Sequence, residues 1–195
     1  MGARAAPLVL TILGFAGIGT LWVWRLGSAD GWDAAFIAVA GVFYALWLLW
    51  ESRVSARELA KGDASHDRKT MELAAAAKIA FLVAALVGGG IAPDAVTGFA
   101  GIVLLGLGIF VRIAAIRALG AAYSHRIRPP LALVTRGPYA IVRHPAYLGT
   151  LVAHTGLAVV FFGPWSVAAL LGAWWPAVVL RASIEDRFLL ESPDY

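Results

Sequence analysis

The stretch GPYAIVRHPAYLG, residues 137–149, joins a cation-rich polar segment to a long apolar run. Upstream of it, residues 112–143 contain six arginines and no acidic residue. Downstream of it, the next charged residue is Arg181, which is followed by Glu185 and Asp186. Two polar clusters therefore bracket two apolar runs, and we expect the clusters to meet at one face of a membrane.

The composition is that of an integral membrane protein. Of the 195 residues, 61% are hydrophobic and 14% are charged, and the mean hydropathy is +0.78, whereas about a quarter of a soluble domain is charged. The apolar residues form long blocks, as membrane-spanning helices require. The sequence contains no cysteine, which excludes disulfides, thiolate metal sites and cysteine nucleophiles. We attribute the net charge of +4 to cytoplasmic loops and expect no nucleic-acid partner.

The predicted fold is all-α: a polytopic bundle of about six transmembrane helices that ends in a helical hairpin. The expected spans cover residues 7–26, 33–50, 73–91, 96–117, 146–162 and 165–180. Residues 1–195 form one domain, in which residues 1–117 supply four spans and residues 118–195 form the C-terminal part. Gly163 and Pro164 are expected to close the hairpin. In the fourth span, four small residues predict close helix packing in lipid: Gly98, Gly101, Gly106 and Gly108.

Charge predicts the orientation of this multi-pass protein. With six spans, the N-terminus, the loop 51–72, the segment 118–144 and the C-terminus share one side, and this side carries most of the cations. Because cytoplasmic loops are enriched in Lys and Arg, we expect both termini and the 137–149 stretch to lie in the cytoplasm.

Two groups of residues are candidates for chemistry. Pro145 suits the first turn of a helix, so His144 would lie at a helix start, where unpaired N–H groups attract anions. Arg181 and Glu185 are four residues apart and share a helix face. Ionisable groups at membrane depth are functional candidates. An interfacial anchor and a solvated helix end are the alternatives from the residues alone.

Several other chemistries are not expected. His154 lies in the middle of a span and fits a hydrogen-bonded core histidine. The four histidines lack a metal-ligand spacing and no HExxH occurs, so we expect no metal. The absence of GxGxxG and GxxxxGK[ST] argues against a Rossmann-type nucleotide site and a P-loop.

The segment LVTRGPYAIVRHPAYLG, residues 133–149, with the distal Arg181, Glu185 and Asp186, resembles the isoprenylcysteine carboxyl methyltransferase family. That family has the pattern LVT-x-GPY-x-x-x-RHP-x-Y-x-G, followed about thirty residues later by R-x-x-x-E-E, so Asp186 stands in place of the second Glu. The resemblance covers about residues 119–195, and phospholipid N-methyltransferases share this C-terminal architecture.

The resemblance implies S-adenosyl-L-methionine as cofactor, in a cytoplasmic-face pocket between the last hairpin and the polar segment before it. Glu185 would hold the polar end of the cofactor and Arg181 the carboxylate of the acceptor, which makes both catalytic candidates. A further polar contact would fall at Ser124 or His125. The resemblance implies these cofactor-lining residues: Leu131, Ala132, Leu133, Val134, Tyr139, His144, Pro145, Ala146 and Tyr147.

The expected function is carboxyl O-methylation of a lipophilic, isoprenylcysteine-like acceptor that enters from membrane lipid. Methyl transfer from a sulfonium requires positioning and desolvation more than acid–base groups, and a carboxylate is already ionised at pH 7. Phospholipid N-methylation and thiol S-methylation are alternatives within the superfamily. A membrane reductase using a reduced nicotinamide cofactor, or a non-enzymatic transporter or scaffold, are the alternatives outside it.

Overall fold

The computed structural model of the protein describes residues 2–59, 70–90, 94–124 and 134–191, and the side chains of residues 2–13, 15 and 56–59 lie outside this description. All regular structure in these residues is helical, as predicted. The elements are α1 (Gly2–Gly27), α2 (Gly31–Leu59), α3 (Thr70–Gly88), α4 (Ala95–Leu119), the 3-10 turns η1 (Gly120–Ala122) and η2 (Gly137–Ala140), α5 (Pro145–Val160), α6 (Pro164–Ala169), the π-helical η3 (Leu170–Trp174) and α7 (Trp175–Leu190). The last three follow without a break and form one rod.

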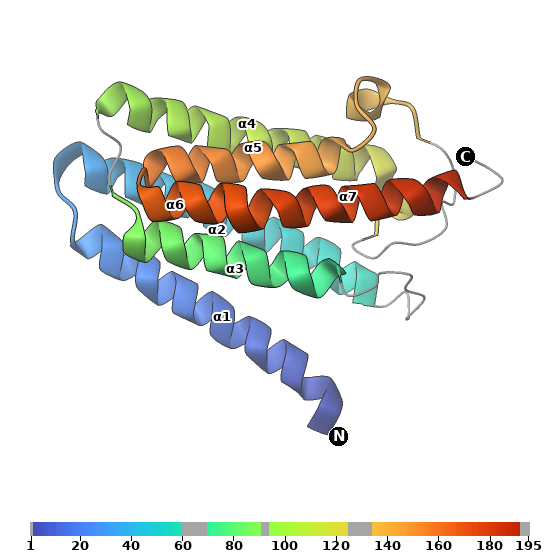
Figure 1. Ribbon diagram of the computed structural model, residues 1–195, viewed down its shortest axis with the longest axis horizontal. Coiled ribbons are helices and arrows are strands. Elements are labelled where there is room, and N and C mark those ends of the chain that lie inside the picture. The colour runs from blue at the N-terminus through green and yellow to red at the C-terminus, as the bar shows by residue number, and fades with distance from the viewer. Residues whose placement is uncertain (1, 60–69, 91–93, 125–133, 192–195) are drawn as a thin grey trace.

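The helices α1 to α5 and the final rod alternate in direction along the bundle (Figure 1). The ends of α1, α3 and α5 and the starts of α2, α4 and α6 lie at one end of it. The ends of α2 and α4, the starts of α3 and α5, and the end of α7 lie at the opposite end. This arrangement confirms that the 137–149 stretch and the final polar helix share one end of the molecule.

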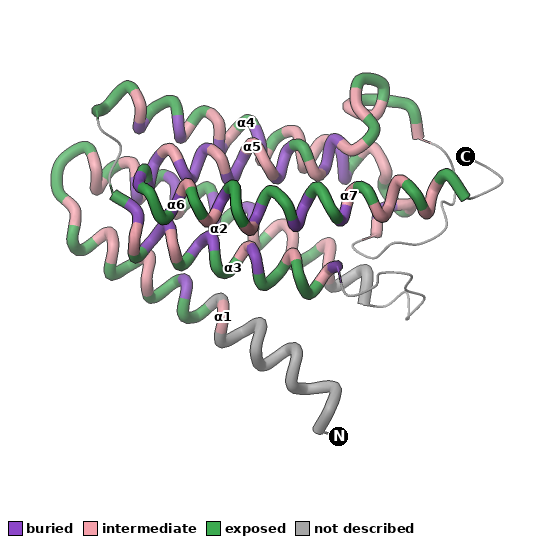
Figure 2. Tube along the Cα trace, in the orientation of Figure 1, coloured by how far each residue is buried: buried purple, intermediate pink, exposed green. Residues whose placement is uncertain are grey.

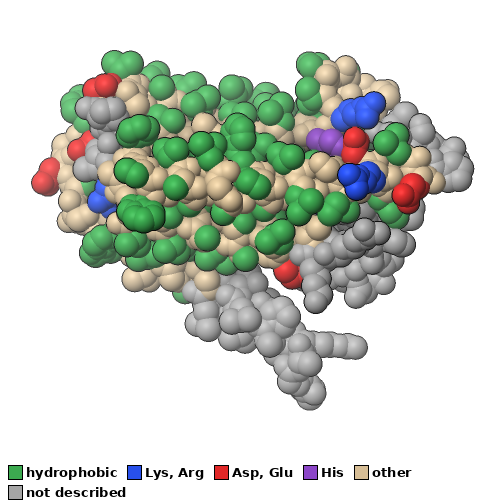
Figure 3. Space-filling view, viewed as in Figure 1, with side chains coloured by type: hydrophobic (Ala, Val, Ile, Leu, Met, Phe, Trp, Pro, Cys, Tyr) green, Lys and Arg blue, Asp and Glu red, His purple; other side chains and the backbone are tan. Residues whose placement is uncertain are grey.

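The surface is that of a multi-pass membrane protein. Within the part of the chain that the structure describes, four helical stretches are long and apolar enough to cross a membrane: Gly31–Ser55, Thr70–Gly88, Ala95–Ala122 and Pro164–Leu190. The helix α5 is apolar and shorter, with 16 residues. Hydrophobic side chains cover the middle of the molecule and charged side chains lie near its two ends (Figure 3). Large apolar side chains such as Phe110 and Trp165 are 68% and 70% exposed, as lipid contact requires.

Local sequence signals set the helix ends. The Asp94 carboxylate caps α4 by accepting the N–H of Thr97 at 2.8 Å and its hydroxyl at 3.1 Å. These hydrogen bonds hold the pKa of Asp94 below its ordinary value. Pro145 and Pro164 lie in the first turns of α5 and α6, where a missing N–H loses no helical hydrogen bond. Gly163 immediately precedes α6, so the predicted tight hairpin is confirmed.

Glycines bring the backbones of α4 and α5 into direct contact. A Cβ atom on Gly108 would lie 2.2 Å from a backbone nitrogen of α5, and one on Gly149 would lie 2.6 Å from a backbone nitrogen of α4. Gly156 meets Gly101 in the same way, with 2.6 Å between the added Cβ and the carbonyl oxygen. The predicted packing role of the α4 glycines is therefore confirmed, and the other two face phenylalanine rings of α2. Buried residues are dense along α5 (Figure 2).

The final rod changes its winding in the middle. Its residues Leu170–Trp174 form one π-helical turn, which contains an extra residue relative to an α-helical turn. Leu170 and Trp174 are both buried, so this turn packs on the core. The extra residue sets the face on which α7 presents its polar side chains.

Candidate active site

The start of α5 lies against the end of α7. The His144 side chain does not cap α5, because its Nε2 lies 3.1 Å from Oδ1 of Asp186, 42 positions along the chain. Arg143 Nη1 lies 3.6 Å from the other oxygen of the same carboxylate. The two polar clusters that the sequence predicts to meet are therefore in contact.

A second contact joins the same two helices one turn further in. The Tyr147 hydroxyl donates to Oε2 of Glu185 at 2.5 Å, a distance typical of an O–H bonded to a carboxylate. The imidazole of His144 lies 5.7 Å from the Tyr147 ring, centroid to centroid. Two neighbouring carboxylates thus reach two aromatic rings at the start of α5. Carboxylates and aromatic faces both attract cations, so this arrangement is suited to a cationic ligand.

The guanidinium of Arg181 is buried, one helical turn before Glu185. Arg181 is 7% exposed, and its Nη1 donates to the hydroxyl of Thr70, the first residue of α3, at 2.9 Å. A buried charge is costly unless it is hydrogen-bonded or paired. Arg181 is therefore not part of a solvated helix end, which was the alternative from the sequence.

The segment before α5 folds over the same end of the bundle. Gly137 adopts a φ of 61°, a left-handed conformation that favours glycine, and η2 begins there. Arg136 Nη2 donates to the carbonyl of Ala118 at 3.4 Å, which ties the segment to α4. The pKa of Tyr139 is raised, mainly by burial and next by the negative charge of Glu185. Tyr139 therefore lies within electrostatic reach of the Tyr147–Glu185 pair.

A buried ion pair joins Glu51 of α2 to Arg112 of α4 and was not predicted from the sequence. Arg112 Nε donates to Oε1 of Glu51, and Nη2 donates to Oε2 at 3.0 Å. The Arg112 and Glu51 side chains are 11% and 18% exposed. The Tyr123 hydroxyl accepts from Arg112 Nη2 at 3.4 Å, and burial raises the pKa of Tyr123 to about 12. Arg112 lies inside a predicted span, and that position was the signal for a functional candidate.

Some of the other residues that the resemblance implies for the cofactor site lie within the described residues, and some lie outside them. Leu131, Ala132, Leu133 and His125 lie outside the described residues. The other predicted cofactor-lining residues are buried or half-buried, and all lie in the segment just before α5 or in its first turn: Val134, Tyr139, His144, Pro145, Ala146 and Tyr147. Ser124 is half-buried at the end of the segment that follows α4.

His154 lies in the core, as the sequence predicts. Its side chain is fully buried, with Nδ1 2.8 Å from the carbonyl oxygen of Thr150 and Nε2 3.3 Å from the Tyr44 hydroxyl. Because a carbonyl only accepts, Nδ1 carries the proton and Nε2 accepts from Tyr44. Three further aromatic rings surround the imidazole. Within the described ranges, no cluster of three or more potential ligand residues could hold a metal ion.

Comparison with known proteins points to the same region. The family model of the Isoprenylcysteine carboxyl methyltransferase (ICMT) family matches residues 100–191. "Protein-S-isoprenylcysteine O-methyltransferase A" of Arabidopsis thaliana is 32% identical over 93 residues, which are 46% of this chain and 47% of the relative. A "Probable protein-S-isoprenylcysteine O-methyltransferase" of Oryza sativa subsp. indica is 30% identical over 95 residues, 47% of this chain and 50% of the relative.

The matched region contains the start of α5 and the polar part of α7, and therefore every contact between those two helices described above. It does not contain Glu51 or Thr70. The chain spans about half the length of the curated relatives that it matches. The resemblance predicted from the sequence is confirmed over residues 100–191, which match the isoprenylcysteine carboxyl methyltransferase family model and include most of the segment similar to these relatives.

Proposed function

We propose that this protein is an integral-membrane methyltransferase that transfers the methyl group of S-adenosylmethionine to the carboxylate of a lipophilic, isoprenylcysteine-like acceptor. The family supports the reaction class. The observation that carries the proposal is the buried guanidinium of Arg181 beside the Tyr147–Glu185 pair. One helix face thus presents a cation for the carboxylate of the acceptor and an anion for the cofactor.

The residues present fit this cofactor. When bound, S-adenosylmethionine supplies a methyl group on a positively charged sulfonium, and it also carries an ammonium group. Glu185, fixed by Tyr147, places negative charge beside aromatic rings at the start of α5. Asp186, which replaces the second Glu of the family pattern, keeps the charge and contacts His144. These residues would hold the cationic end of the cofactor, while Tyr139 would line the same pocket.

Methylation of the acceptor requires its orientation and the exclusion of water more than it requires a general base. Its carboxylate is ionised at pH 7, so no residue must remove a proton from it. Arg181 would bind this carboxylate, because a guanidinium matches the geometry of two carboxylate oxygens. Burial of Arg181 excludes water from the contact, and Thr70 fixes the direction of the guanidinium. Positioning of this kind accounts for a large part of catalysis when a displacement must be in line.

We further propose that this end of the bundle faces the cytoplasm. Five exposed arginines of the described residues lie on it: Arg53, Arg117, Arg136, Arg143 and Arg187. The opposite end presents Arg25 together with Asp30, Asp33 and Asp94. An excess of Arg and Lys is typical of cytoplasmic loops. A lipophilic acceptor would then enter from the bilayer, and the soluble cofactor from the cytoplasm.

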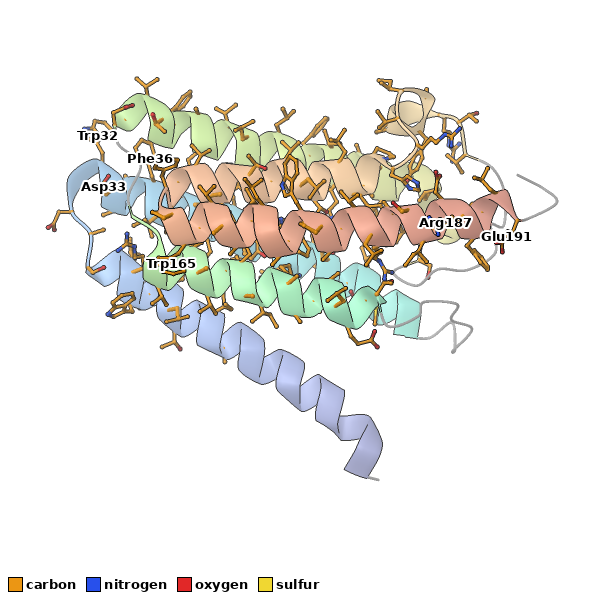
Figure 4. All side chains as sticks on the ribbon, viewed as in Figure 1. Trp32, Asp33, Phe36, Trp165, Arg187 and Glu191 are labelled. Carbon is orange, nitrogen blue, oxygen red and sulfur yellow. The ribbon has the colours of Figure 1, made fainter. Side chains whose placement is uncertain are left out.

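The test uses the full chain, purified in detergent, with radiolabelled S-adenosylmethionine and three acceptors: a prenylated cysteine, a phospholipid amine and a thiol. We expect a base-labile methyl ester on the prenylated cysteine. Arg181→Ala and Glu185→Ala should abolish it. Substitution to alanine of Arg187, exposed on the same helix, or of Glu191, exposed just after its end, should not (Figure 4).

Other outcomes of that experiment would overturn parts of the proposal. Full activity in both Arg181→Ala and Glu185→Ala would defeat the site assignment. Methylation of the phospholipid or thiol alone would replace the acceptor class. Failure of the wild-type protein to bind S-adenosylmethionine in a calorimetric titration would favour a non-enzymatic membrane protein.

A further inference from the structure

The guanidinium of Arg112 connects three helices. Besides its two hydrogen bonds to Glu51, Arg112 donates from Nη1 to the Thr150 hydroxyl at 2.8 Å and to the carbonyl of Ala146 at 3.3 Å. Glu51 is itself held by the indole N–H of Trp47, which donates to Oε1 at 2.9 Å. One buried ion pair thus ties the cytoplasmic-end part of α2 and α4 to the first turns of α5.

The contact with α5 allows little movement. A Cβ atom on Gly149 would lie 2.6 Å from the backbone nitrogen of Arg112 and 3.0 Å from its Cα, so the two backbones already touch. Ala146 and Thr150 flank Tyr147 on the same helix, one residue before it and three after it. Any shift of the Arg112 side chain would therefore act on the turn that carries the Tyr147 hydroxyl.

Stability alone does not account for such a pair. Desolvation of a buried ion pair offsets much of its attraction, and apolar residues of similar volume often stabilise a protein as well or better. In contrast, a guanidinium bonded to four groups fixes the geometry of all of them. The fixed geometry here is that of the α5 start, where Tyr147 meets Glu185.

We propose that Glu51 and Arg112 are positioning residues, which hold the first turns of α5 so that Tyr147 and Glu185 form the cofactor site. This inference rests on the proposed function. It also makes α2, which lies outside the family-matched residues, a working part of the site. Neither residue touches the cofactor, and both act through Thr150 and the Ala146 carbonyl.

The test compares two threonines of α5. The Thr150 hydroxyl accepts from Arg112 and donates to the Ala146 carbonyl at 3.0 Å. The Thr155 hydroxyl donates to a carbonyl of its own helix, that of Leu151, at 2.8 Å. Valine keeps the β-branched shape in both cases. Thr150→Val removes the shorter of the two hydrogen bonds from Arg112 to α5 and leaves the one to the Ala146 carbonyl, and Thr155→Val is the matched control.

Two readouts are measured on the purified full chain. The first is amide hydrogen exchange of residues 148–152 without cofactor, which we expect to be faster in Thr150→Val and unchanged in Thr155→Val. The second is the Kd of S-adenosylhomocysteine by calorimetry, which we expect to rise roughly tenfold in Thr150→Val and less than twofold in Thr155→Val, because one hydrogen bond to a charged group is lost. Glu51→Gln should weaken binding in the same way.

The outcomes separate this inference from the proposed function. If wild-type protein does not bind S-adenosylhomocysteine, the proposed function fails, and hydrogen exchange still reports whether the pair orders α5. If wild-type protein binds it and both threonine variants bind equally well, the positioning role is wrong. Equal exchange at residues 148–152 in both variants would overturn it independently.

Discussion

The guanidinium of Arg181, on α7, donates from Nη1 to the hydroxyl of Thr70, at the start of α3, over 2.9 Å. Both residues are buried. Thr70 lies in the half of the chain that the family match does not cover. The N-terminal helices therefore contribute directly to the orientation of the residue proposed to bind the acceptor.

Replacing Thr70 by Val should loosen Arg181 while leaving the cofactor contacts intact. Loss of one hydrogen bond to a charged group costs about 1.5 kcal/mol of binding free energy, or somewhat less where other contacts remain. The KM for the acceptor should therefore rise roughly fivefold to tenfold. The Kd of S-adenosylhomocysteine should change less than twofold. Thr70→Ser keeps the hydroxyl and should restore the KM. An unchanged KM in Thr70→Val would show that Thr70 does not orient Arg181.

Tyr147→Phe should weaken cofactor binding selectively. The variant removes the hydroxyl that donates to Glu185 at 2.5 Å, a hydrogen bond to a carboxylate worth about 1.5–3 kcal/mol. We expect the Kd of S-adenosylhomocysteine, measured by calorimetry, to rise at least tenfold. The control is Tyr44→Phe, which removes the hydroxyl bonded to His154 in the core. Equal cofactor affinity in both variants would contradict a role for the Tyr147–Glu185 pair.

Gly108→Ala should destabilise the bundle, because the added methyl would lie 2.2 Å from a backbone nitrogen of α5. Overpacking of this kind costs typically about 1–3 kcal/mol, and more where backbone must move. The thermal midpoint in detergent should fall by several degrees. Gly19→Ala, whose methyl would meet no atom within 4 Å, should leave the midpoint within a degree. A neutral Gly108→Ala would show that α4 and α5 separate easily.

The phenol of Tyr123 should make the protein less stable in alkali. Its pKa is about 12 in the folded protein, above the ordinary value of 10.0, mainly because the phenol is buried. As pH rises from about 10 to about 12, the unfolded chain loses this proton before the folded protein does, so the folded state loses stability in that window. Thermal midpoints between pH 9.5 and 11 should fall less steeply for Tyr123→Phe than for wild type. Parallel curves for the two proteins would refute this assignment.

Much of the fold follows from the sequence because membrane helices are specified by local patterns. The six apolar runs became six rods, and Gly163 with Pro164 turned the chain as expected. The contact between the start of α5 and α7 followed from antiparallel helices that share one end. His144 and Tyr147 were accordingly placed beside the acidic residues of α7.

The contacts made by α2 and α3 could not be predicted in this way. Glu51 directly follows the apolar part of α2 and Thr70 begins α3, and polar residues are usual at both positions, so nothing local distinguishes them from solvated positions. Their partners are 61 and 111 positions away along the chain. Only the packing of helices decides which residue at the end of one span faces which residue in another. Arg112 differs from Glu51 and Thr70, because a charged residue within an apolar run is a local sign that a partner is needed, although it does not identify the partner.

The π-helical turn at Leu170–Trp174 imposes a length constraint on the final rod. Each residue advances an α-helix by about 100°, so one residue more or fewer turns every later side chain by that angle. Gly172 makes no contact that a Cβ would disturb, yet its deletion would rotate Arg181 away from Thr70. The number of residues between Pro164 and Arg181 therefore matters as well as their identity, and substitutions at exposed positions such as Leu171 should be tolerated far better than insertions or deletions.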